Sequence, residues 1–150
     1  MDLILWRHAE AEDGVPDAAR KLTPKGRKQA EKVAQWLKDR IESPMRVLVS
    51  PAVRTQQTAS ALTDKFETSS EIGLSTSVKR VLQVTGCPHA QGTVIVVGHQ
   101  PTLGQVAAFL LTGETADWDV KKGAVWWFEI EDNGGEPYVS LRAVIAPREA

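Results

Sequence analysis

Short apolar runs alternate with helix-period stripes along most of the chain. Continuous apolar runs near residues 2–6, 46–49 and 93–97 have no helical period and predict strands buried on both faces. Apolar residues at three- and four-residue spacing predict helices over roughly 24–41, 51–65, 75–84 and 101–111. Two later strand-like runs, 124–130 and 138–145, flank Gly134-Gly135, which predicts an antiparallel hairpin.

This alternation of strands and helices with short connections predicts an α/β fold. We expect a three-layer α/β/α sandwich whose sheet is mostly parallel and ends in the antiparallel C-terminal hairpin. No repeat, low-complexity block or linker divides the 150 residues, so residues 1–150 are predicted to form a single domain.

Each of the first three predicted strands ends next to a cation or an imidazole. Arg7-His8 follows the first strand, Arg54 lies just beyond Ser50-Pro51 after the second, and His99 follows the third. An isolated Arg-His pair is more often an ordinary basic turn. Three such strand ends are harder to obtain by chance, because the carboxyl ends of strands in open α/β sheets are where ligands bind.

With these segments the sequence resembles the histidine phosphatase (phosphoglycerate mutase-like) superfamily. Arg7-His8-Ala9 matches its Arg-His-Gly signature, with alanine in place of the usual glycine, and residues 50–59 (SPAVRTQQTA) match its second arginine segment. Gly98-His99 matches its second histidine. The small size, residues 98–101 (GHQP) and residues 20–30 (RKLTPKGRKQA) are most similar to the SixA-type phosphohistidine phosphatases.

A phosphoryl group carries negative charge, so a site that transfers it needs several cations in a small volume. Arginine suits this role because its planar fork meets two phosphate oxygens at once. The resemblance implies that His8 is the nucleophile, forming a covalent phosphohistidine intermediate, and that His99 donates to the phosphate oxygens. The expected catalytic residues are Arg7, His8, Arg54 and His99.

Two further residues are open to a functional or an ordinary interpretation. Arg20 either touches substrate at the mouth of the cleft, as the matching arginine of SixA-type proteins suggests, or is simply solvated. Larger members of the superfamily carry an acidic residue between the second arginine and the second histidine, and Glu71 is the only candidate for it here. Phosphohistidine needs less help from an acid, because its leaving nitrogen can be protonated first.

Composition excludes several classes of function. A net charge of −1 gives no field that would recruit nucleic acid or a membrane surface. The single cysteine, Cys87, cannot form an internal disulfide, and no segment is typical of a signal peptide or membrane span, so we expect a cytoplasmic protein. The histidines at 8, 89 and 99 lack metal-ligand spacing, so neither a metal nor another cofactor is expected, and His89 is predicted to be a surface residue.

The leading hypothesis is a metal-independent phosphatase acting on phosphohistidine of a phosphorylated protein, with a histidine-containing phosphotransfer domain as the candidate partner. One alternative is a phosphomonoesterase for small metabolites, which an acid role of Glu71 would favour. Another is a phosphate- or phosphoprotein-binding module without turnover. A mutase is disfavoured, since long insertions that would grip a sugar or glycerate phosphate are missing. The sequence does not indicate an oligomeric state.

Overall fold

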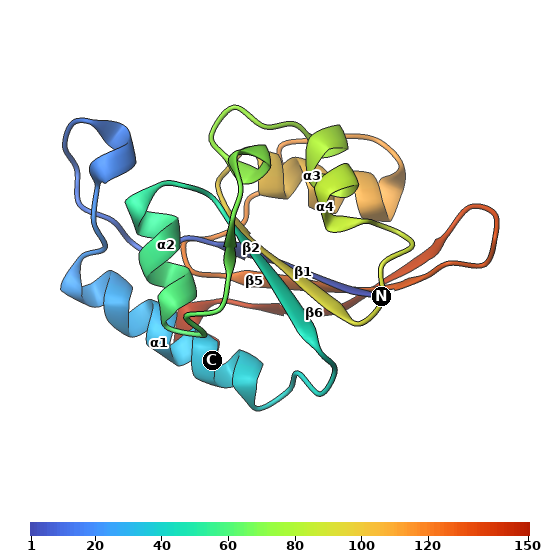
Figure 1. Cartoon of the computed structure of the whole chain (residues 1–150), viewed down its shortest axis with the longest axis horizontal. Helices are drawn as coiled ribbons and strands as arrows, with labels where there is room; N and C mark the ends of the chain where they lie inside the picture. The colour runs from blue at the N-terminus through green and yellow to red at the C-terminus, as the bar shows by residue number, and fades with distance from the viewer.

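A computed structural model describes the whole chain, residues 1–150 (Figure 1). The sheet contains β1 (Asp2–Arg7), β2 (Met45–Val49), β3 (Glu67–Thr68), β4 (Thr93–Gly98), β5 (Val125–Glu131) and β6 (Tyr138–Ile145). The α-helices are α1 (Pro24–Lys38), α2 (Val53–Ser60), α3 (Val78–Thr85) and α4 (Thr102–Thr112). Three short 3₁₀ helices complete the chain: η1 (Asp17–Ala19), η2 (Ser70–Ile72) and η3 (Pro147–Glu149).

The six strands are ordered β3-β2-β4-β1-β5-β6. β1, β2, β3 and β4 are parallel to their neighbours in this group, whereas β5 is antiparallel to β1 and β6 is antiparallel to β5. This confirms the predicted mostly parallel sheet with an antiparallel C-terminal hairpin. The carboxyl ends of β1, β2 and β4 therefore meet at one edge of the sheet.

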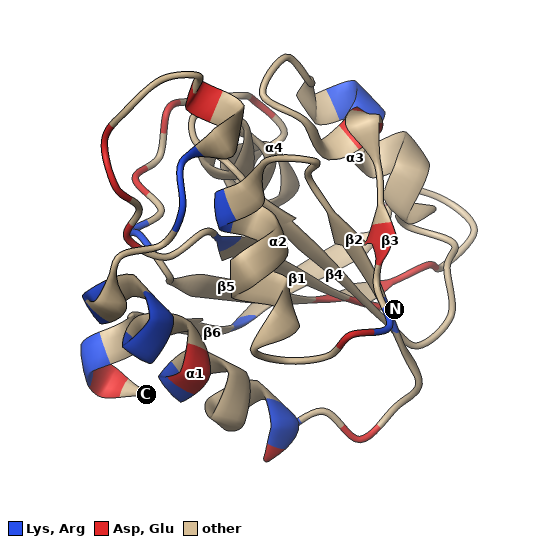
Figure 2. Cartoon of the chain, turned by 60° about the vertical axis from the view of Figure 1, so that its left-hand side comes forward, with Lys and Arg blue, Asp and Glu red and all other residues tan.

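Helices cover both faces of this sheet, with α1 and α2 on one side and α3 and α4 on the other (Figure 1). On β1, Leu3 and Leu5 pack into the core beneath α3 and α4, while Ile4 and Trp6 pack into the core beneath α1 and α2. A strand that supplies both cores must be apolar at every position, which is why its sequence shows no alternation. Charged residues gather on α1 and the loops, and α4 carries none (Figure 2).

The sequence signals for helix ends act as expected. The Thr23 side chain accepts a hydrogen bond from the Gly26 N–H at 2.9 Å, and Pro24 occupies the first helical position of α1. Gly113 ends α4 with a φ of +82°, a left-handed conformation that glycine adopts without strain. The start of α1 at Pro24 and the end of α4 at Thr112 agree with the ranges predicted for these helices.

The predicted helix over 51–65 is wrong at its C-terminal end, because α2 stops at Ser60. There the hydrogen bonds reach back three residues instead of four: the Ala61 N–H donates to Thr58 O and the Leu62 N–H donates to Ala59 O. Leu62 is thereby buried, and the following residues lead back to the sheet as β3, a two-residue strand that the sequence pattern does not predict. Pairing of β3 with β2 accounts for the shorter helix.

Two neighbouring tryptophans on β5 lie on opposite faces of the sheet. Trp126 packs beside Trp118 on the α3 and α4 face, and Trp127 packs edge-on against Trp36 of α1. Their rings pack into the two cores. Among the helices, none has the length and apolar character that crossing a bilayer requires.

Candidate active site

The three strand ends that carry the predicted chemistry lie side by side. The backbone N–H of His8 donates to Gly98 O at the end of β4 at 3.2 Å, and on the other side of β4 the Ser50 N–H donates to Val97 O at 3.1 Å. These bonds fix the loops after β1 and β2 on either side of the loop after β4. The structure thus brings together all four predicted catalytic residues: Arg7, His8, Arg54 and His99.

His8 is buried, and one of its two ring nitrogens is hydrogen-bonded to the backbone. Its Nδ1 lies 2.7 Å from Ala9 O. A carbonyl can only accept, so Nδ1 carries the proton and Nε2 keeps its lone pair. The Thr58 hydroxyl oxygen accepts from the Ala9 N–H at 3.1 Å and anchors this turn to α2. Burial, with smaller contributions from Arg54 and Arg7 against the opposing effect of the Ala9 carbonyl, lowers the pKa of His8 to about 4. The imidazole is therefore neutral at physiological pH.

His99 faces His8 from the end of β4, with ring centroids 5.5 Å apart and ring planes inclined by 53°. Its Nε2 lies 2.8 Å from the Ser50 hydroxyl, and its buried Nδ1 has no hydrogen-bond partner. Burial, then the charge of Arg54, lowers the pKa of His99 to about 3, so this ring is also neutral. Two neutral imidazoles thus lie on either side of a small volume.

Arg54 is buried and Arg7 is partly buried beside these rings. Arg54, on the first turn of α2, is only 3% exposed, and Arg7 donates through Nη1 to Val120 O at 2.9 Å. The Nε atoms of both arginines are buried and have no hydrogen-bond partner. Together with Nδ1 of His99, these are all the buried side-chain nitrogens or oxygens without a partner in the protein. Such groups are costly unless a ligand satisfies them, so this pocket is suited to an anion that accepts several hydrogen bonds.

Arg20 belongs to the edge of this pocket, although it makes no direct contact with the histidines. Asp17 of η1 accepts from Arg54 Nη2 at 3.1 Å and from Arg20 Nε at 3.0 Å, so one carboxylate joins the two arginines. Those hydrogen bonds, that from Arg54 above all, hold the pKa of Asp17 below its usual value. The charge of Arg20 in turn contributes to the lowered pKa of His8. The sequence pattern did not predict a role for Asp17 in the site. The one sequence feature that pointed to it is its position three residues before Arg20.

Glu71 is not brought into the pocket by any contact. It lies in η2, where its backbone N–H donates to the Ser69 hydroxyl and its backbone carbonyl accepts from the Thr76 hydroxyl. Its carboxylate forms no hydrogen bond or ion pair with the arginines or histidines of the site. The neighbouring Ile72 is the residue of η2 that packs inward, against Gly98.

Ala9, the departure from the superfamily signature, is accommodated by packing. It is fully buried in a small apolar cluster with Leu22 and Ala30. The methyl group of Ala9, which a glycine does not have, is therefore covered by apolar side chains. The substitution fits the local core of the loop after β1.

The third histidine lies far from this chemistry. His89 follows α3 on the surface, with its side chain 76% exposed and its Nδ1 paired with Asp132. This confirms the prediction that it is a surface residue. No three His, Cys, Asp or Glu side chains anywhere in the chain cluster in a way that could hold a metal ion.

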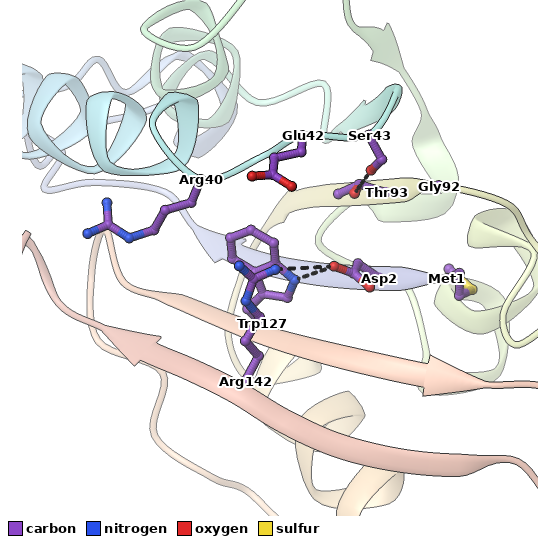
Figure 3. Close-up of a pocket in the computed structure, with 9 residues that line it drawn as sticks. All are labelled: Met1, Asp2, Arg40, Glu42, Ser43, Gly92, Thr93, Trp127 and Arg142. Atoms are coloured by element: carbon purple, nitrogen blue, oxygen red, sulfur yellow. Dashed lines mark hydrogen bonds and ion pairs between the residues drawn. The ribbon is translucent and has the colours of Figure 1, made fainter.

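A hollow of about 330 Å³ lies at the opposite edge of the sheet, where β1 and β4 begin (Figure 3). There the Arg142 guanidinium stacks 4.0 Å above the Trp127 ring, and the Trp127 Nε1–H donates to the Asp2 carboxylate at 2.9 Å. The hydroxyls of Ser43 and Thr93 are 2.6 Å apart. None of the buried unpartnered nitrogens lies here, so this hollow lacks the feature that marks the active-site candidate.

The lowered pKa of His8 predicts an unusual response to acid. His8 should take up a proton near pH 4, whereas an unfolded chain does so near pH 6.5. Between these values the unfolded state binds more protons than the folded one, so the free energy of unfolding should fall as pH drops from about 6.5 to about 4. NMR titration of the His8 ring, assigned by its loss in His8→Ala, would check this, and a midpoint near 6.5 would contradict it.

Comparison with known proteins agrees with this geometry. Residues 3–75 match the family model of the histidine phosphatase superfamily, branch 1. The chain is 30% identical over 128 residues to the phosphohistidine phosphatase SixA of Escherichia coli strain K12, covering 77% of each chain. It is 35% identical over 127 residues to a phosphohistidine phosphatase SixA homolog of Haemophilus influenzae, covering 73% of this chain and 77% of that one.

Similarity in three dimensions extends over the whole molecule. The fold superposes on the solved structure of the protein histidine phosphatase SixA complexed with tungstate with a TM-score of 0.80, at 28% identity, covering 99% of this chain and 98% of the other. The sequence relatives and the shared fold lead to the same assignment. The chain belongs to the histidine phosphatase superfamily, among its SixA-type phosphohistidine phosphatases.

Proposed function

We propose that this protein removes the phosphoryl group from phosphohistidine on a protein, through a covalent phosphohistidine formed on His8. One observation carries this proposal: the buried nitrogens without partners belong to Arg7, Arg54 and His99. The charges of both arginines act on His8, and the ring of His99 lies next to it. An array of donors around an uncharged nucleophile matches the needs of phosphoryl transfer. The related SixA structure contains tungstate, a tetrahedral oxyanion of similar shape.

In the first step, the donors of Arg7, Arg54 and His99 bind the oxygens of the incoming phosphoryl group. The lone pair on Nε2 of His8 attacks phosphorus, while the bond from phosphorus to the substrate nitrogen breaks. The substrate imidazole, already protonated by solvent, takes that electron pair and leaves as a neutral ring. Arginine charge offsets the negative charge of the phosphoryl oxygens throughout this step.

In the second step, water attacks the phosphorus of the phosphorylated His8. The bond to Nε2 breaks, inorganic phosphate leaves, and the neutral imidazole is restored. Because burial lowers the pKa of His8 to about 4, the ring returns to its nucleophilic form without waiting for a separate deprotonation. Both steps use the same donors, so no large rearrangement is required between them.

The proposed partner is a phosphorylated protein, and a histidine-containing phosphotransfer domain is the class we expect. Two relatives named as phosphohistidine phosphatases support this choice. We also propose a cytoplasmic location, which the single unpaired cysteine suits.

The test offers the purified protein a phosphorylated histidine phosphotransfer protein, a phosphohistidine peptide, para-nitrophenyl phosphate and glycerol phosphate. We expect phosphohistidine to be turned over best. Better turnover of glycerol phosphate would instead identify a metabolite phosphatase. Tight binding of the phosphorylated protein without loss of phosphate would identify a binding module.

A Glu71→Gln variant addresses the role of an acid. The change keeps the shape of the side chain and removes only its acidity, and we expect phosphohistidine turnover to change by less than about tenfold, below the usual contribution of a general acid. Without such an acid, the rate should depend steeply on the leaving group, so aryl phosphates should react far faster than alkyl phosphates. A large loss in Glu71→Gln, with good turnover of alkyl phosphates, would contradict this account.

A further inference from the structure

The buried hydroxyl of Ser50 is the feature of the site that the mechanism above leaves unused. Ser50 follows β2 and is 1% exposed. Its Oγ lies 2.8 Å from His99 Nε2, on the opposite side of the ring from the unpartnered Nδ1. The hydrogen-bond partners around this hydroxyl decide which nitrogen of His99 carries the proton.

The Ser50 oxygen already accepts one hydrogen bond, from the Ala52 N–H at 3.3 Å. The hydroxyl hydrogen needs an acceptor, and His99 Nε2 is the one within reach. The nearby Ser50 carbonyl is itself occupied, because it accepts from Gln56 Nε2 at 2.9 Å. The Thr55 hydroxyl also lies 2.9 Å from this carbonyl and shares its one hydrogen with Ala52 O at 2.7 Å. Donation from Ser50 to Nε2 therefore satisfies the hydroxyl completely.

The reverse arrangement leaves two groups unsatisfied. If Nε2 carried the proton, it would donate to Ser50 Oγ, and the hydroxyl hydrogen would have no acceptor in a place closed to solvent. Nδ1 would then be a buried lone pair without a donor. Since buried polar groups strongly favour being paired, the first arrangement is preferred.

We infer that Ser50 is a positioning residue that fixes His99 in the tautomer with its proton on Nδ1. This inference rests on the proposed function for its catalytic meaning, since Nδ1–H is then the donor left for the phosphoryl oxygens. His8 and His99 thus hold the same tautomer for opposite purposes. The backbone carbonyl of Ala9 occupies the N–H of His8 and frees its lone pair, whereas Ser50 occupies the lone pair of His99 and frees its N–H.

The low pKa of His99 makes this control necessary. A charged imidazole would present a proton on both nitrogens, but a ring with a pKa of about 3 is neutral and has a single N–H to place. Without the Ser50 hydroxyl, both tautomers would be populated and only part of the protein would offer the donor. We expect Ser50→Ala to lower kcat for phosphohistidine by about tenfold or more, with a smaller change in KM.

The direct test is ¹⁵N NMR of the histidine rings in the free protein at neutral pH, with His99 assigned from its loss in a His99→Asn variant. The wild type should show a protonated Nδ1 and a bare Nε2 at His99. Ser50→Ala should populate the other tautomer, and Ser50→Thr, which keeps the hydroxyl, should retain that of the wild type. The matched control is Ser43→Ala, which removes a serine hydroxyl bound to Thr93 at the opposite edge of the sheet (Figure 3).

A protonated Nε2 at His99 in the wild type would overturn the inference without any variant. An unchanged tautomer in Ser50→Ala would overturn it too, as would full kcat in that variant. These outcomes leave the proposed function standing. By contrast, a wild type that shows the expected tautomer but turns over no phosphohistidine would refute the proposed function, and the catalytic meaning of Ser50 with it.

Discussion

His8→Ala should lower phosphohistidine turnover by at least about a thousandfold, on the scale seen when a nucleophile is removed. The variant keeps the arginines and His99, so it should still bind phosphate, but it has no lone pair to attack phosphorus. The variant should still fold, because the hydrogen bond from the Ala9 N–H to the Thr58 hydroxyl continues to hold the end of β1. Release of inorganic phosphate from a phosphohistidine peptide, together with a thermal unfolding curve, would measure both effects.

The matched control for this variant is His89→Ala. His89 is an exposed histidine paired with Asp132, so its loss should leave turnover within about twofold of the wild type. Retention of a tenth or more of the activity by a folded His8→Ala variant would remove His8 from the mechanism.

Arg54→Ala should reduce kcat/KM for phosphohistidine by about a hundredfold or more, the effect of losing one preorganised charge-stabilising group. The Arg54 guanidinium is buried, contributes to the lowered pKa of both histidines and holds Asp17. Its removal should therefore also raise the pKa values of His8 and His99 towards their ordinary range. Arg7→Ala should cause a loss of similar size.

Arg46→Ala is the control for charge removal. Arg46 forms an exposed ion pair with Glu67 on β2 and β3, away from the pocket, so activity should be unchanged within about twofold. If Arg54→Ala and Arg46→Ala lowered kcat/KM equally, the special role of Arg54 would have to be abandoned.

The proximity of the four proposed catalytic residues follows from the sequence pattern. Apolar runs place Arg7, Arg54 and His99 beside the ends of strands, and neighbouring parallel strands end at the same edge of a sheet. The hairpin after β5 is equally readable, since two strand-like runs flank adjacent glycines. These predictions depend on spacing within one segment at a time, which a single sequence displays fully.

The features that escaped prediction depend on contacts between segments. β3 is two residues long and exists because β2 offers a pairing edge, which also explains why α2 ends at Ser60. Asp17 joins Arg20 to Arg54, and Arg54 lies 37 positions after Asp17 in the chain. Ser50 gains its importance only from the ring of His99. Apart from the spacing of Asp17 and Arg20, none of these contacts has a local signal in the sequence.

Trapping the phosphorylated enzyme shows directly whether His8 is the nucleophile. The protein is mixed with substrate carrying a radioactive phosphoryl group, quenched in base within one turnover, and digested for peptide mapping. We expect label that is stable in base, labile in acid and located on His8 in the peptide from the end of β1. Label on His99 instead, or turnover of phosphohistidine with no labelled protein at any quench time, would contradict it.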